Sequence, residues 1–312
     1  MKRGNRSLKF LLVGLGLAVA CNGASAAEAA SCETVRFGMM AWTDLAATTA
    51  VARTLFEDLG YKTSDSTASQ PIIFGAMRDN RLDAFLGYWS PSADSIVEPF
   101  RSKAQVKVLD EPSLADGQMT LAVPTWLAEK GLRTFQDIHK FKKELGGKIY
   151  GIDPGTDINR RLQAAIDAKR FDLEGFKLVE SSEAGMLSAV ARAENRKEAI
   201  VLVGWKPHPM NIHFNLTYLT GSDGLMGADE GKATVWTVVR GDYAQQCPNA
   251  ARLLSNIRFN SAQEAQMMER ILNREDPMKV ARDFLKANPA LVNDWLAGVT
   301  RFNGDTATIA AN

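Results

Sequence analysis

Short apolar runs and amphipathic stretches alternate along most of the 312-residue chain, as in proteins where each strand is followed by a helix. The apolar runs predict strands at 34–40, 61–68, 83–89, 105–110, 119–124, 148–153, 176–181, 199–205 and 233–240. The amphipathic stretches predict helices at 44–59, 70–81, 92–102, 125–145, 157–169, 183–195, 249–258, 261–273, 277–287 and 289–297. This alternation predicts an α/β protein whose mainly parallel sheets are covered by helices.

An internal similarity suggests two related lobes. Residues 80–91 (NRLDAFLGYWSP) and 195–207 (NRKEAIVLVGWKP) share Asn-Arg, an acid, Ala, an apolar run and a final Trp-x-Pro. Two lobes whose corresponding strands end alike would produce such a repeat.

The N-terminal segment has the features of an export signal. Residues 1–9 are basic, the next residues form a short apolar run, and Ala24-Ser25-Ala26 is an A-x-A cleavage site. A membrane anchor needs a longer apolar run of about 20 residues, so we predict a signal peptide over 1–26, cleaved near Ala26. Lipidation at Cys21 is the weaker alternative, because Ala18 stands where such sites usually have Leu.

Removal of residues 1–26 changes the charge and the cysteine count. The segment holds four of the 37 Lys and Arg and none of the 36 Asp and Glu, which leaves 33 basic against 36 acidic side chains. This slightly acidic balance argues against binding to nucleic acid or anionic membranes. Two cysteines stay, Cys32 and Cys247, and an even pair in an exported protein favours a disulfide over two free thiols.

Three of the six tryptophans follow predicted strands directly. Trp42, Trp89 and Trp205 stand where a strand ends and the loop to the next helix begins, and ligands of open α/β sheets bind at that edge. Each Trp alone would suit a side chain that seals the sheet. Three together favour an aromatic cage for a quaternary ammonium group, which attracts the cation without needing a hydrogen-bond donor.

Other polar residues near these tryptophans have two interpretations each. Asp44 suits the N-cap of the helix that follows, and it equally suits a ligand-facing carboxylate that balances positive charge. His208 and His213 follow Trp205, but two histidines without a Cys or carboxylate at ligand spacing are weak evidence for metal, so we predict no metal site. His208 is better explained as a residue that shapes the loop.

At this point the chain resembles a known family. The segments FGMMAWTDLAATTAVARTLFEDLGY, DAFLGYWSP, LAVPTW, GIDPGTDINR and GWKPHPMN are similar to periplasmic binding proteins of ABC importers for glycine betaine, choline and related osmolytes, most of all the choline-binding branch. The resemblance covers nearly the whole mature chain. It implies a type II-like fold of two α/β lobes that close on the ligand, with residues 27–113 plus about 224–312 in lobe I and about 114–223 in lobe II.

The resemblance also implies a set of ligand-binding residues. In the choline-binding members four aromatic residues form a box that an Asp and an Asn complete; Trp42, Trp89 and Trp205 match three aromatics and Asp44 the acid. Met119 stands where the family has Tyr, and Thr156 where it has Asn. A thioether wall still accommodates methyl groups, so the departures affect mainly the polar end of the ligand. Arg160 is the nearest basic residue, and its helical position favours a solvent-facing side chain.

The predicted function is therefore an exported, monomeric, periplasmic solute-binding protein that needs no cofactor and delivers its ligand to the permease of an ABC importer. Choline ranks first as the ligand, followed by carnitine or glycine betaine. A module that reports ligand occupancy to a sensor is one alternative. A periplasmic enzyme is the other, although HExxH, GxSxG and Walker A motifs are missing from the sequence and its three histidines leave few candidates for a general base.

Overall fold

The computed structural model of the chain describes residues 27–308. The predicted signal peptide, with the cleavage site near Ala26 and the alternative lipidation site Cys21, lies outside the described residues. Within 27–308, none of the helices combines the length and the apolar character that crossing a membrane requires.

The strands are β1 (Thr34–Met39), β2 (Lys62–Thr67), β3 (Ala84–Ser90), β4 (Val106–Val108), β5 (Leu114–Pro124), β6 (Lys148–Tyr150), β7 (Lys177–Val179), β8 (Leu202–Lys206), β9 (Leu216–Tyr218) and β10 (Lys232–Arg240). The α-helices are α1 (Thr43–Asp58), α2 (Gln70–Arg78), α3 (Asp94–Arg101), α4 (Thr125–Glu129), α5 (Asp157–Asp167), α6 (Glu183–Arg196), α7 (Met210–His213), α8 (Tyr243–Gln246), α9 (Pro248–Asn256), α10 (Ser261–Leu272), α11 (Pro277–Ala287) and α12 (Pro289–Trp295). Three short 3-10 helices are η1 (Ala30–Cys32), η2 (Phe135–Phe141) and η3 (Arg170–Asp172).

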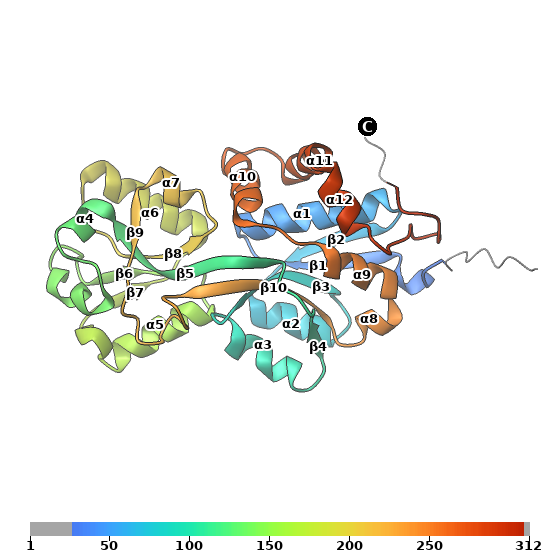
Figure 1. Cartoon of the computed structure of the whole chain (residues 1–312). Helices are drawn as coiled ribbons and strands as arrows, with labels where there is room; N and C mark the ends of the chain where they lie inside the picture. The colour runs from blue at the N-terminus through green and yellow to red at the C-terminus, as the bar shows by residue number, and fades with distance from the viewer. Residues whose placement is uncertain (1–26, 309–312) are drawn as a thin grey trace, which may run out of the picture.

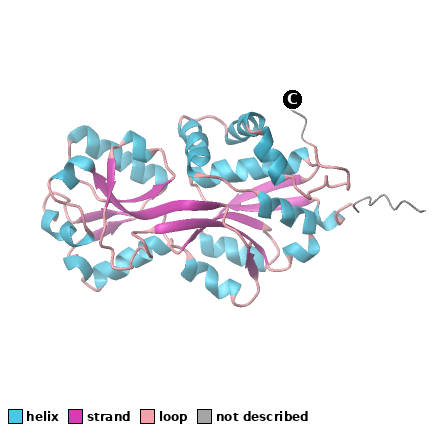
Figure 2. Cartoon of the chain, in the orientation of Figure 1, coloured by secondary structure: helices cyan, strands magenta, loops and turns pink. Residues whose placement is uncertain are grey.

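These elements form two lobes around one twisted sheet, and Figures 1 and 2 show helices on both faces of the sheet in each lobe. The strand order is β2-β1-β3-β10-β5-β8-β6-β7, with β4 paired to β10 and β9 to β5. Strands β2, β1 and β3 pair in parallel, as do β8, β6 and β7. The strands that pair with β5 or β10 do so in the antiparallel direction.

Strands β5 and β10 connect the lobes (Figure 1). The first lobe holds β1–β4, α1–α3 and α8–α12, and the second holds α4–α7 and β6–β9. Strand β10 pairs with β3 and β4 of the first lobe, and β5 pairs with β8 and β9 of the second. Because β5 and β10 also pair with each other, they join the two parallel half-sheets into one. This architecture confirms the predicted two-lobe α/β fold.

Several predicted boundaries move once the tertiary structure forms. The helix predicted at 70–81 ends at Arg78, since Asn80 adopts a left-handed φ of 54° that a helix does not allow. Strand β5 begins at Leu114, five residues before the predicted start at Met119. Its first part is half-exposed between the lobes and so lacks an apolar pattern. The short elements α7 and β9 were not predicted, because four and three residues are too few for a periodic signal.

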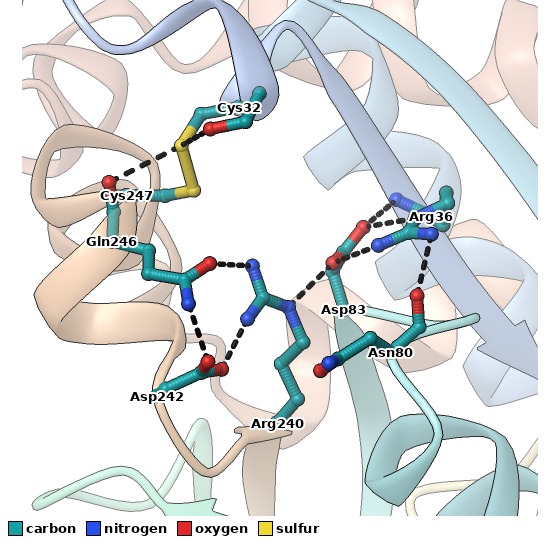
Figure 3. Close-up of polar contacts among 9 residues, drawn as sticks. Cys32, Arg36, Asn80, Asp83, Arg240, Asp242, Gln246 and Cys247 are labelled. Carbon is teal, nitrogen blue, oxygen red and sulfur yellow. Dashed lines mark hydrogen bonds and ion pairs between the residues drawn. A yellow bond between two sulfur atoms is a disulfide. The ribbon is translucent and has the colours of Figure 1, made fainter.

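Covalent and ionic contacts brace the first lobe (Figure 3). The predicted disulfide between Cys32 and Cys247 is confirmed, with the two Cα atoms 5.7 Å apart. The buried carboxylate of Asp83 accepts hydrogen bonds from Arg36 Nε at 2.7 Å and from Arg240 Nε at 2.9 Å. The two arginines lie on β1 and β10, and Asp83 precedes β3. Loss of Asp83 would leave the buried guanidinium of Arg240 with Asp242 as its remaining ion-pair partner, which is costly for a buried charge.

Candidate functional site

A pocket between the two lobes collects residues from five separate segments. Its lining residues are Trp42, Asp44, Trp89, Met119, Ile152 and Trp205, and we call this site the aromatic pocket. The first lobe supplies Trp42, Asp44 and Trp89, and the rest come from the connecting strand β5 and the second lobe. Thus the three tryptophans predicted at strand ends meet at one place, together with Asp44 and Met119.

The start of α1 determines where Trp42 and Asp44 lie. The helix begins at Thr43 and Trp42 is its N-cap residue, with the Trp42 carbonyl accepting from Ala46 N at 2.9 Å. The alternative role of Asp44 as N-cap is therefore wrong, because Asp44 already lies inside the first turn. Trp42 is held from the opposite lobe, where Asp153 Oδ2 accepts a hydrogen bond from Trp42 Nε1 at 2.8 Å.

The Asp44 carboxylate is buried with only one oxygen satisfied by a side chain. Trp89 Nε1 donates to Asp44 Oδ2 at 3.1 Å, whereas Oδ1 has no hydrogen-bond partner among residues 27–308. Asp44 is 5% exposed, and burial together with the nearby Glu183 carboxylate raises the pKa of Asp44 to about 6. A buried carboxylate with one unsatisfied oxygen is costly, so this side chain gains from a cation beside it.

The opposite wall is formed by paired strands. Met119 on β5 and Trp205 on β8 are direct partners in the antiparallel register, which brings both side chains to the same face. The Trp205 ring packs edge-on against the imidazole of His208, with centroids 4.8 Å apart. His208 Nδ1 accepts from Met210 N at 3.0 Å, so this histidine shapes the loop after β8. His208 is outside the lining of the aromatic pocket.

Three further candidates lie away from the pocket wall. Thr156 is buried at the N-terminus of α5, where its hydroxyl donates to the Asp153 carbonyl at 2.9 Å. Arg160 is half-exposed and forms an ion pair with Asp157. His213 pairs with Glu269 of α10 at 2.8 Å, at the surface between the lobes. Within 27–308, no group of three or more His, Cys, Asp or Glu side chains is placed to hold a metal ion.

Ile152 is the lining residue that the sequence reasoning missed. It follows β6 and precedes the Pro-Gly turn, so it occupies a strand end like the three tryptophans. Asn159 holds its backbone, accepting from Ile152 N at 3.1 Å and donating to Ile152 O at 2.8 Å. A search of strand ends for apolar residues of every kind would have found it.

The lining carries one carboxylate and no Lys or Arg, so the charge at the wall of the aromatic pocket is negative. The free cavity measures about 10 Å³, which is room for about one water molecule.

Comparison with known proteins defines the class. Residues 33–287 match the family of the substrate binding domain of the ABC-type glycine betaine transport system, and the chain belongs to this family. It is thus a substrate-binding protein of the ABC-type glycine betaine transport family, as predicted.

Individual relatives show the same likeness. An ABC-transporter choline binding protein in complex with choline is 45% identical, with a TM-score of 0.87 over 89% of this chain and 96% of that one. An ABC-transporter choline binding protein in an unliganded semi-closed conformation, also 45% identical, has a TM-score of 0.82 over 90% and 97%. The glycine betaine/carnitine transport binding protein GbuC of Listeria monocytogenes is 32% identical over 53% of this chain and 55% of its own length.

Proposed function

We propose that this protein captures a small quaternary ammonium cation, choline first, in the aromatic pocket and delivers it to the permease of an ABC importer. The observation that carries the proposal is the unpaired Asp44 Oδ1, buried beside Trp42, Trp89 and Trp205. The three indole rings attract a cation that has no N–H donors, each contributing on the order of 0.5–2 kcal/mol.

The charge of the pocket favours a cation over a zwitterion. Carnitine and glycine betaine both carry a carboxylate, which would need a donor or a positive charge. The lining offers neither Lys nor Arg, and Arg160 is engaged with Asp157. A carboxylate close to Asp44 would be repelled, whereas a net cation such as choline would be attracted. The 45% identical relative that holds choline supports the same ranking.

The two-lobe architecture supports a capture role. We infer that lobe I comprises residues 27–113 and about 224–312, and lobe II about 114–223, because β5 and β10 are the strands that connect the two groups of helices. Closure of the lobes would bury the ligand and present the closed form to the permease. Export to the periplasm as a monomer, after cleavage near Ala26, belongs to this proposal.

The experiment is isothermal titration calorimetry of the mature chain with choline, carnitine, glycine betaine and 3,3-dimethylbutan-1-ol. The last compound is the uncharged carbon isostere of choline, so it separates charge from shape. We expect choline to bind most tightly and at least tenfold more tightly than the isostere. Equal affinities for choline and the isostere would refute the role of Asp44. Tighter binding of carnitine or glycine betaine would refute the ranking and leave the class intact.

A further inference from the structure

Glu183 lies behind the aromatic pocket and joins the two lobes. It is the first residue of α6 in the second lobe, it is 3% exposed, and it does not line the pocket. Its Oε2 accepts a hydrogen bond from the backbone N–H of Thr43 at 3.0 Å, and its Oε1 accepts one from the Thr43 hydroxyl. Thr43 belongs to the first lobe, so both bonds form only when the lobes are together.

Thr43 is a donor that its own helix cannot satisfy. As the first residue of α1 it has a free N–H, because the first turn of a helix has no carbonyl partner upstream. A carboxylate at that position is further favoured by the helix dipole. When the lobes are apart, water would form hydrogen bonds with Thr43 and with the Glu183 carboxylate. On closure, Glu183 takes the place of that water at Thr43 and accepts two charge-assisted hydrogen bonds.

The same carboxylate also faces the other wall of the pocket. His208 Nε2 lies 3.4 Å from Glu183 Oε1, and the His208 ring packs against Trp205. Thr43 stands between Trp42 and Asp44, both of which line the pocket. Glu183 therefore contacts Thr43, which lies between the pocket residues Trp42 and Asp44 of the first lobe. It also contacts His208, which packs against Trp205 in the second lobe.

We infer that Glu183 is a positioning residue that latches the closed form, holding Thr43 of the first lobe and His208 of the second so that the tryptophans stay in place around the ligand. This inference rests on the proposed function. A latch formed only in the closed state slows ligand release and leaves ligand entry nearly unchanged, since affinity differences among variants of one site arise mostly in the dissociation rate.

Thr43→Val tests the latch without changing the charge of the site. It removes the hydroxyl that Glu183 accepts, and we expect choline to dissociate about tenfold faster with an association rate within twofold of wild type, measured by stopped-flow tryptophan fluorescence. Thr43→Ser keeps the hydroxyl and should restore the wild-type rate. A structural role in folding alone would not separate Val from Ser in this way.

Glu183→Gln tests the other partner. It should speed the dissociation of choline and of 3,3-dimethylbutan-1-ol by similar factors, because a latch acts on any ligand, whereas a purely electrostatic role would affect choline alone. In the Glu183→Gln variant, adding Thr43→Val should increase the dissociation rate less than threefold further, because both substitutions act on the same contact. Glu194→Gln is the matched control, since Glu194 lies on the same helix and has no ion-pair partner among residues 27–308; it should leave the rate unchanged.

Dissociation rates equal to wild type in both Thr43→Val and Glu183→Gln would overturn the latch while choline binding stands. If the wild-type chain binds none of the tested ligands, the proposed function fails, and hydrogen exchange of the Thr43 amide in the ligand-free chain becomes the readout. The latch then requires faster exchange in Glu183→Ala than in wild type, and an unchanged exchange rate overturns it.

Discussion

The two halves of the aromatic pocket differ in charge and in how they are held. The half from the first lobe contains Trp42, Trp89 and the carboxylate of Asp44, and the lobe behind it is braced by a disulfide and the buried Asp83 cluster. The other half, Met119, Ile152 and Trp205, is apolar and supported by strand pairing. The negative charge of the pocket thus comes from the first lobe alone, and the other half contributes only apolar surface. Substitutions can therefore remove the charge and the apolar surface separately.

The largest effect should come from the brace of the charged half. Cys32→Ser with Cys247→Ser opens a covalent link between residues 215 positions apart, and the chain-entropy model gives a loss of about 5 kcal/mol in unfolding free energy. Urea unfolding monitored by circular dichroism measures it. Neither cysteine lines the pocket, so the choline Kd should stay within threefold; a larger change would mean that the brace also positions Asp44.

Asp44→Asn removes the charge from its half and preserves the shape. The amide oxygen still accepts from Trp89 Nε1, so the ring stays in place. We expect choline to bind about 100-fold more weakly, which corresponds to about 2.7 kcal/mol. Binding of 3,3-dimethylbutan-1-ol should be unchanged or improved. Calorimetry that shows equal losses for both ligands would mean that Asp44 acts through shape.

The tryptophans of the two halves should respond differently to conservative change. Trp205→Ala should weaken choline binding tenfold or more, at about 1.4 kcal/mol per decade, with the fold intact. Trp89→Phe should cost more than Trp205→Phe, because Trp89 also donates its indole N–H to Asp44. Trp126→Phe, outside the pocket, is the control. An unchanged Kd in Trp205→Ala would remove that residue from the site.

The pH dependence should report on the charged half alone. Since the pKa of Asp44 is raised to about 6, choline affinity should be constant above that pH and fall about tenfold per unit below it, because the cation binds the ionised carboxylate. The stability of the ligand-free chain runs the opposite way. Asp44 holds its proton more tightly when folded, so its contribution to stability decreases as pH rises from about 4 to 6. Asp44→Asn should flatten both curves, and a wild-type affinity that does not change between pH 7 and 5 would contradict the assignment.

The smallest effect should come from the apolar half. Met119→Tyr with Thr156→Asn restores the residues of the choline-binding pattern and should tighten choline binding a fewfold, by calorimetry. Most of the gain should come from Met119, which faces Trp205 across paired strands, since Thr156 lies outside the lining. The ranking of ligands is wrong if the wild-type chain does not bind choline but binds carnitine or glycine betaine, and the double variant no longer binds either of them.

Local pattern and motif in the sequence were enough to determine the class of the fold, the partners of the disulfide and the strand-end positions of Trp42, Trp89 and Trp205. These properties depend on residues that are neighbours in the chain or on the count of cysteines, and parallel strands necessarily bring their ends to one edge. Asp44 was a candidate from its position two residues after Trp42, and the family resemblance added Met119; both line the aromatic pocket.

Only the tertiary structure decided which groups meet across the two lobes. It showed that Asp44 is a buried carboxylate, not a helix cap, and that its Oδ1 has no hydrogen-bond partner among residues 27–308. It also brought Ile152 into the lining and left Thr156 outside. It also joined Thr43 to Glu183, which is 140 residues away in the chain. Contacts of this kind have no local sequence signal, because they depend on how β5 and β10 set one lobe against the other.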